Sequence, residues 1–144
     1  MYKDEAVNGV IAVLNPPFPH IFPVKKLIGD TPNLFLGSQN CSDKASGAYT
    51  GETSAAMLAS FGATYVIIGH SERREYFKES NQLLTENTKQ ALANGLTPIF
   101  CCGEPLGERD AENHFEYVGK QLHDSLSYLS NEEFDQVQVQ IPRM

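Results

Sequence analysis

The residues best suited to chemistry lie around His70. The apolar run Tyr65–Ile68 is rich in β-branched side chains and predicts a buried strand, which Gly69 ends. His70 follows the carboxyl end of this strand, the place where α/β proteins bind ligands. Ser71 is predicted to cap a short helix that opens with Glu72, and the positive end of this helix disfavours an imidazolium. His70 is therefore a candidate neutral proton donor, with a structural histidine as the alternative.

The charged residues after His70 allow two interpretations. His70 and Glu72 could be a base and the carboxylate that orients it. Alternatively, Glu72, Arg73 and Arg74 form a capped and salt-bridged helix start without a chemical role.

The three cysteines are candidates for nucleophilic or metal chemistry, and the sequence disfavours both. Cys101 and His70 could form a nucleophile pair, but a cysteine in an apolar strand is usually a small core residue. Cys101 and Cys102 are adjacent in one predicted strand and point to opposite faces. One metal could not readily hold both thiolates together with His70 and Glu104, so we expect no metal site.

Length and composition are those of an ordinary soluble domain. The chain has 144 residues, 41% hydrophobic and 20% charged, with a formal net charge of −7. This charge argues against general binding to nucleic acid or to an anionic membrane. No apolar run approaches the ~20 residues of a membrane span, and the start has no signal-peptide pattern. The odd cysteine count favours a reduced, cytoplasmic setting.

Strands and helices are predicted to alternate in units of roughly thirty residues, as parallel βαβ repeats do. The predicted strands are 10–14, 34–36, 65–68, 97–102 and 134–141. The predicted helices are 22–28, 52–61, 80–94 and 111–126. The continuous run Val10–Leu14 predicts a strand buried on both faces. The last helix is expected to bury an apolar side formed by Phe115, Val118, Leu122 and Leu126.

Parallel strands of this kind collect chemical groups at one rim, just after each strand. Asn15, Gln39–Asn40, His70–Glu72 and Gly103–Glu104 all occupy such positions. No dinucleotide or P-loop glycine pattern follows a strand, which disfavours a nucleotide-binding doubly wound sheet. The loop Gly47–Glu52 could be an active-site lid or a docking arm, and Tyr49 at its tip favours docking.

Five blocks of sequence together resemble the triosephosphate isomerase family. They are Asn15-Pro-Pro-Phe18, Gln39-Asn-Cys41, Ser46-Gly-Ala-Tyr-Thr-Gly-Glu52, Tyr65-Val-Ile-Ile-Gly-His-Ser-Glu-Arg-Arg74, and Ala91-Leu-Ala-Asn-Gly-Leu-Thr-Pro-Ile-Phe-Cys101 with Gly103-Glu104. The resemblance runs from about Val10 to Phe134. It divides a single partial domain, residues 1–144, into a leader (1–9), a family-like part (10–134) and a divergent tail (135–144).

The resemblance implies an α/β fold, the (β/α)₈ TIM barrel, here incomplete. It implies interconversion of dihydroxyacetone phosphate and glyceraldehyde 3-phosphate in glycolysis and gluconeogenesis, without a cofactor. His70 would be the electrophile that polarises the substrate carbonyl, and the family keeps this histidine neutral at a helix N-terminus. Glu72 would lie near the catalytic lysine, and Cys101 would pack behind the catalytic glutamate.

The resemblance also implies a symmetric homodimer. The loop from Gln39 to Glu52 would insert into the partner subunit, where Thr50 would reach the active site and Glu52 would pair with the partner's Arg73. The residues expected at this interface are Gln39, Asn40, Tyr49, Thr50, Gly51, Glu52 and Arg73.

The chain departs from the family's pattern at both ends. A complete barrel takes ~250 residues, and these 144 match roughly its second to fifth units. The family's Asn-x-Lys segment is not found before Val10. The segment that carries the catalytic glutamate, Tyr-Glu-Pro-Val-Trp, is replaced by Val137-Gln-Val-Gln-Ile-Pro-Arg-Met144, and the phosphate-binding loops after strands seven and eight are missing. We therefore expect an inactive chain.

Three hypotheses account for such a chain. It is an incomplete isomerase from a truncated or wrongly bounded reading frame, which we favour, or one half of a split isomerase, or a non-catalytic dimerisation module. A half barrel has two open edges, so the isolated chain is expected to aggregate or to stay partly molten. A monodisperse species with a cooperative melt would refute that expectation.

Overall fold

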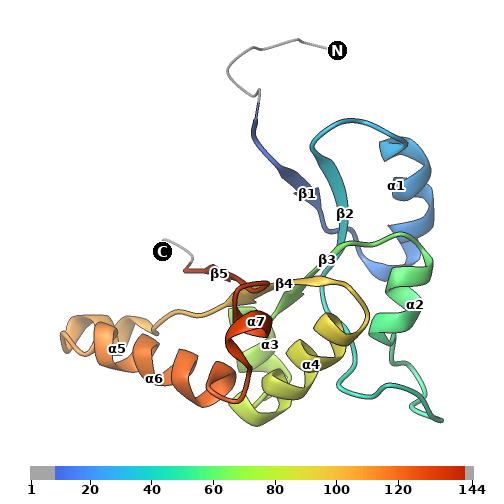
Figure 1. The fold of residues 1–144 in the computed structure, drawn as a ribbon. Coiled ribbons are helices and arrows are strands. Elements are labelled where there is room, and N and C mark those ends of the chain that lie inside the picture. The colour runs from blue at the N-terminus through green and yellow to red at the C-terminus, as the bar shows by residue number, and fades with distance from the viewer. Residues whose placement is uncertain (1–8, 142–144) are drawn as a thin grey trace.

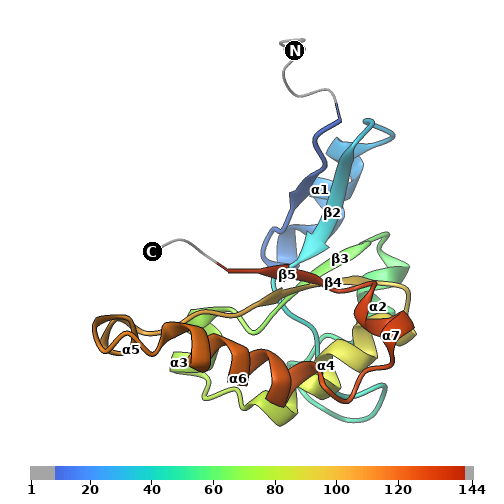
Figure 2. The same ribbon diagram turned by 60° about the vertical axis from the view of Figure 1, so that its left-hand side comes forward.

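A computed structural model describes residues 9–141, which are organised by one parallel sheet. Its strands are β1 (Ala12–Leu14), β2 (Leu34–Ser38), β3 (Tyr65–Ile68), β4 (Thr97–Cys101) and β5 (Gln138–Gln140). They pair in chain order, and every pair is parallel. The sheet curls, and helices follow one another along one side of it (Figures 1 and 2). This confirms the expected fold class, a curled half-barrel consistent with an incomplete TIM barrel.

The helices lie between successive strands, as right-handed crossovers require. They are α1 (Ile21–Ile28), which follows the 3₁₀ turn η2 (Phe18–His20), α2 (Ala55–Ser60), α3 (Ser71–Tyr76), α4 (Asn81–Ala93), α5 (Leu106–Asp110), α6 (His114–Leu126) and α7 (Asn131–Phe134). Serine side chains cap three of them by accepting a main-chain N–H, at Ser54, Ser80 and Ser130. None of the helices in residues 9–141 is long and apolar enough to cross a membrane.

Two predicted helices have different bounds in the structure. The expected helix 52–61 is shorter, because Ser54 caps it and α2 begins at Ala55. The expected helix 111–126 begins later, as α6 at His114, since Glu112 adopts a positive φ of 60° between α5 and α6.

The core lies between the sheet and its helices. Val66 and Ile68 of β3, Phe100 of β4, and Leu58 and Leu84 of the helices are fully buried. Thr88 and Ala91 of α4 are also fully buried. This closed core holds the carboxyl ends of β3 and β4 in fixed positions, and the functional site depends on them.

Burial at the two edges of the sheet differs from the prediction. The run Val10–Leu14 was expected to be buried on both faces, yet Val10, Ile11 and Leu14 are 55%, 58% and 44% exposed. Within the described residues β1 pairs with β2 alone, so nothing covers its other edge. The apolar side expected for α6 also differs. Phe115 is 83% exposed, and Leu126 is the one residue of that side that is buried. At the opposite edge all three residues of β5 are exposed.

Candidate active site

The rim of the sheet gathers three of the predicted positions around one hollow. Asn15 after β1, Gln39 after β2 and His70 after β3 line a cavity of about 450 Å³. The Gln39 side chain donates a hydrogen bond to the Asn15 carbonyl at 3.0 Å, which ties two of these loops together. The remaining lining residues are Ile67, Glu72, Arg73, Tyr76 and Phe77. Glu104 lies outside this hollow, and its carboxylate pairs with Arg109 instead.

His70 occupies the N-cap position of α3, and this corrects the expected cap at Ser71. Its Nδ1 atom accepts the main-chain N–H of Glu72 at 3.4 Å, and Ser71 is the first helical residue. A nitrogen that accepts a hydrogen bond carries no proton, so the ring proton lies on Nε2. The cap therefore uses Nδ1 as the acceptor and leaves Nε2–H as the donor of the ring, and 46% of the side chain is exposed.

Glu72 lies beside His70 without orienting it. Its Oε2 atom is 3.8 Å from Nδ1, which is beyond hydrogen-bond distance, and its side chain is 71% exposed. Since the Glu72 main-chain N–H takes up Nδ1, the backbone rather than the carboxylate sets the tautomer of His70.

The two arginines after Glu72 have partners that the sequence did not predict. The Nε and Nη2 atoms of Arg73 each lie 2.7 Å from Oε1 of the buried Glu79. Arg74 donates to the carbonyls of Gly69 (2.8 Å) and Cys101 (3.2 Å) and to Asn81 Oδ1 (2.9 Å). The salt bridge of Arg73 at this helix start is made with Glu79. Both arginines anchor the segment that carries His70.

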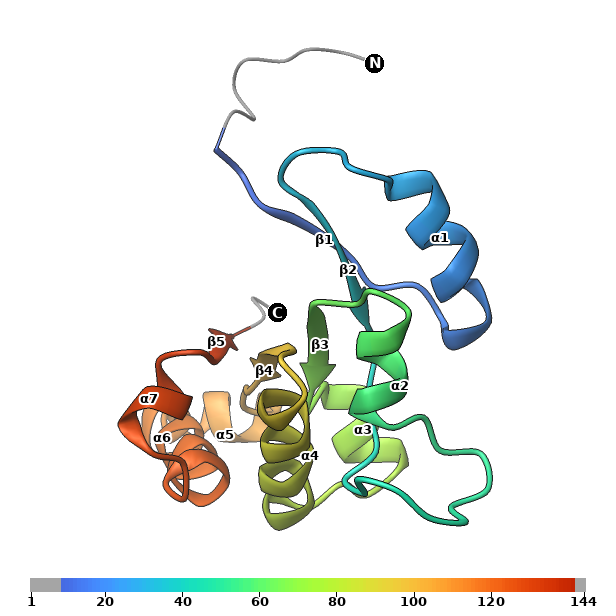
Figure 3. The same ribbon diagram turned by 45° about the vertical axis from the view of Figure 1, so that its right-hand side comes forward.

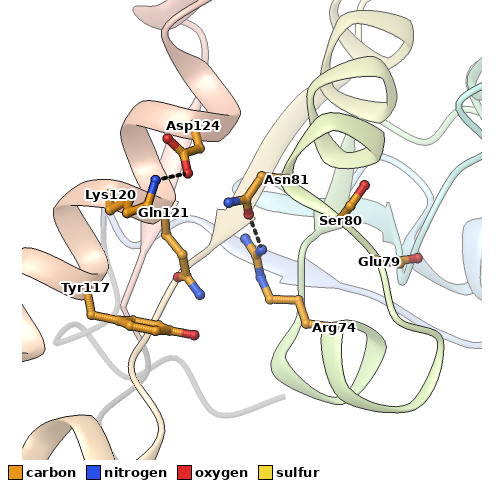
Figure 4. A pocket seen from close by; sticks show the side chains of 8 residues that line it. All are labelled: Arg74, Glu79, Ser80, Asn81, Tyr117, Lys120, Gln121 and Asp124. Atoms are coloured by element: carbon orange, nitrogen blue, oxygen red, sulfur yellow. Dashed lines mark hydrogen bonds and ion pairs between the residues drawn. The ribbon is translucent and has the colours of Figure 1, made fainter.

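A second hollow, of about 340 Å³, lies beside this anchor (Figure 4). Arg74 and Asn81 form one wall, and Lys120 and Asp124 of α6 form the other, paired at 2.8 Å. These four side chains already have partners, so we interpret this hollow as a gap between α4 and α6.

Gly69 determines the path of the main chain into His70. A side chain at this position should therefore lower the stability of the fold. The φ of Gly69 is +75°, and an added Cβ would lie 2.9 Å from Arg74 Nη2 and 3.1 Å from the Cys101 carbonyl. Gly69→Ala should lower the stability of the β3 end by roughly 2–4 kcal/mol, from left-handed strain plus crowding. Protection of the β3 amides in hydrogen exchange measures this loss.

Gly95→Ala is the matched control for that substitution. Gly95 has a similar φ of +71°, but its added Cβ meets nothing within 4 Å. Strain alone then applies, about 1 kcal/mol. Equal losses of protection in the two variants would show that crowding at Gly69 is unimportant.

The cysteines are poor nucleophiles in this fold. Burial, with a smaller contribution from Glu79, raises the pKa of Cys41 to about 12. Burial likewise raises the pKa of Cys101 and of Cys102. Because the thiolate is the reactive form, these shifts favour the interpretation of Cys101 as a core residue. Within residues 9–141 no group of three or more His, Cys, Asp or Glu side chains could hold a metal ion.

The residues expected at a subunit interface fall on two neighbouring surfaces. The loop between β2 and α2 projects from the body of the molecule (Figure 3), and Tyr49 at its tip is 48% exposed. Asn40, at the start of this loop, is instead nearly buried, at 8% exposed. On α3 and just after it, Tyr76 and Phe77 are 69% and 67% exposed. The sequence analysis did not single out these two aromatic residues, although both follow closely after Arg73.

Comparison with known proteins agrees with the resemblance found in the sequence. The family model described as triosephosphate isomerase matches residues 2–141. The triosephosphate isomerase of Cytophaga hutchinsonii is 51% identical over 137 residues, 95% of this chain and 54% of that protein. Those of Porphyromonas gingivalis and Bacteroides fragilis are 52% and 54% identical, over 85% and 84% of this chain and 48% and 47% of theirs. The chain thus spans about half the length of these relatives.

Proposed function

The chain belongs to the triosephosphate isomerase family, and we propose that it contributes the electrophile of that reaction. The observation that supports this role is the cap at α3, where His70 Nδ1 accepts the Glu72 N–H and leaves Nε2–H as a donor toward solvent. The substrates proposed are dihydroxyacetone phosphate and glyceraldehyde 3-phosphate, and no cofactor is proposed.

The proposed chemistry of His70 is a proton relay. Interconverting a ketose and an aldose moves one proton between neighbouring carbons and another between the two oxygens. The Nε2–H bond polarises the carbonyl oxygen and donates to it as negative charge develops there. Once Nε2 has given up this proton, the imidazolate can take a proton from the second oxygen, which returns His70 to its neutral form. Asn15 and Gln39, on the same hollow, offer amide groups to a polar substrate.

We further propose that the 144-residue chain is inactive by itself. The lining of the hollow includes one carboxylate, Glu72, which lies beside Nδ1 and faces solvent, and it includes no lysine. Without a base to remove the carbon-bound proton, His70 has no developing charge to stabilise, and general bases contribute ~10²–10⁴-fold. An incomplete isomerase fits this best, with one half of a split isomerase as the alternative.

The experiment that tests this proposal is a coupled isomerase assay. The chain is assayed alone and together with a second polypeptide that carries the family's remaining units, including their lysine and glutamate. Turnover only in the mixture supports the split enzyme, and turnover by neither supports an incomplete enzyme or a dimerisation module. Turnover by the chain alone refutes the proposed inactivity.

We also propose a symmetric dimer formed through the loop between β2 and α2. The exposed Tyr49 would pack on Tyr76 and Phe77 of the other subunit, and Glu52 would approach the partner's Arg73. Such an arrangement covers three aromatic side chains that are exposed in the single chain. A glycolytic role and three unpaired cysteines favour the cytoplasm as its location.

Charge reversal at Glu52 tests this dimer. Glu52→Lys brings two cations together and should weaken dimerisation about tenfold or more, measured by analytical ultracentrifugation. Glu86→Lys makes the same charge change at an exposed site on α4 and should leave dimerisation unchanged. Equal effects of both substitutions would indicate a general charge effect and contradict the docking role of the loop.

A further inference from the structure

The loop between β2 and α2, the docking loop (residues 39–54), is fastened near its start to α4. Its residue Cys41 is fully buried, and the Cys41 carbonyl accepts a hydrogen bond from Asn87 Nδ2 at 2.7 Å. The Cys41 Sγ atom lies 3.7 Å from the Asn87 carbonyl, to which it is a weak donor. Asn87 belongs to α4 and lies 46 positions further along the chain, so this pair joins two segments that are distant in the sequence.

An asparagine is an unfavourable residue at the position of Asn87. Only 3% of Asn87 is exposed, on a helix that also buries Leu84 and Ala91. Asparagine forms helices less readily than leucine or alanine, and a buried amide lowers stability unless it is hydrogen-bonded. An apolar residue would avoid both effects. What the amide provides is its bond to the main chain of the docking loop.

Beyond this attachment the docking loop is closed by contacts of its own. The Ser42 N–H donates to the Thr53 carbonyl at 2.9 Å, which joins the two ends of the loop. At the tip the Glu52 N–H donates to the Tyr49 carbonyl at 3.0 Å. The Tyr49 ring packs on Gly47, where an added Cβ would lie 2.7 Å from the ring. The loop is therefore preformed, and a shift at its base would move the tip with it.

The same helix holds the surface on which this loop would dock. Asn81, the first residue of α4, accepts a hydrogen bond from Arg74 at 2.9 Å, and Glu79 accepts one from Arg73 at 2.7 Å. Both arginines belong to α3, the helix whose end carries the two exposed aromatic residues of that surface. In a two-fold dimer each copy supplies both halves of the contact, so their relative position is set within one chain. Through these bonds α4 fixes the two halves relative to each other.

We propose that Asn87 is a positioning residue of the dimer contact. Its amide holds Cys41, and through the loop it holds Tyr49 and Glu52 where a second copy of this chain receives them. This inference rests on the dimer proposed above and names the residue that presents its docking loop. A preformed loop loses less conformational freedom on association than a mobile one, and it therefore binds more tightly. Because its side chain is buried in its own chain, Asn87 acts through the loop.

The test compares two variants of Asn87 in the full chain. Asn87→Leu keeps the size of the side chain without the donor, and Asn87→Ala removes the donor without crowding. Both should weaken dimerisation about tenfold or more in analytical ultracentrifugation. Both should also lower the hydrogen-exchange protection of the Ser42 amide by roughly 10- to 100-fold relative to the β3 amides, because the Cys41 carbonyl loses its donor.

Thr85→Val is the matched control, since it removes a different buried hydrogen bond of α4. The Thr85 hydroxyl donates to the Ser125 carbonyl of α6 at 2.8 Å, and not to the docking loop. This variant should weaken the contact between α4 and α6. The dimer affinity and the relative protection of the Ser42 amide should stay unchanged.

The unsubstituted chain provides a measurement that does not depend on the folding of any variant. Its Ser42 amide should exchange no faster than the central amides of α4, because the base of the loop opens only when α4 does. Faster exchange at Ser42, unchanged behaviour of both Asn87 variants, or an equal loss of dimer affinity with Thr85→Val would each overturn the role of Asn87. A chain that is monomeric at every concentration would overturn the proposed dimer itself, which exchange measured on the single chain separates from a failure of Asn87.

Discussion

Replacing His70 by glutamine should lower turnover by about 10²–10⁴-fold in the assembly completed with the family's remaining units. Glutamine has a similar reach and keeps an N–H donor, so substrate binding should change little. It cannot move protons between the two substrate oxygens, because its amide does not titrate near neutral pH. The loss should therefore fall on kcat, measured in the coupled assay, with KM nearly unchanged.

His123→Gln is the matched control for that substitution. His123 lies on α6 with 78% of its side chain exposed, away from the hollow around His70. It should leave kcat unchanged. A similar loss in both variants would mean that the effect is structural, and an unchanged kcat in His70→Gln would remove His70 from the reaction.

Replacing Arg74 by methionine should lower stability as strongly as Gly69→Ala does. The substitution removes donors from the Gly69 and Cys101 carbonyls and from Asn81 Oδ1, which join the ends of β3 and β4 to the start of α4. Burial lowers the pKa of Arg74, so the charge is held at a cost that these bonds offset. Partly buried acceptors left unpaired should cost roughly 2–4 kcal/mol in total. Protection of the β3 and β4 amides against hydrogen exchange should fall by about 30- to 1,000-fold.

Lys120→Met provides the comparison for Arg74→Met. Lys120 lines the same hollow and pairs with Asp124, but its side chain is 73% exposed. An exposed pair of this kind contributes about 0–1 kcal/mol, so protection should change little. If Arg74→Met behaved like Lys120→Met, the anchoring role of Arg74 would be wrong.

Strong local patterns were sufficient to predict the central elements. The apolar run Tyr65–Ile68 predicted β3 with its observed bounds, and Ser80 predicted the start of α4. The N-cap at His70 was missed because two neighbouring residues, His70 and Ser71, can both cap a helix. Only the path of the chain after Gly69 decides between them.

Contacts between distant segments could not be predicted in the same way. Arg74 reaches Cys101 across 27 positions of sequence, and no local pattern indicates that bond. The exposure of β1 was also missed, because an apolar strand is buried only where a neighbour covers it. The predicted aggregation of the isolated chain stays a prediction, and the exposed strands β1 and β5 are where it would begin.

The most direct test of the account is the coupled assay of triose phosphate turnover on the purified 144-residue chain. On the proposed function we expect no turnover above that of an identically prepared His70→Gln chain, because the residues that line the hollow include one carboxylate, Glu72, which faces solvent, and no lysine. Turnover by the chain alone that His70→Gln abolishes would contradict this account, since a base would then have to lie within these 144 residues.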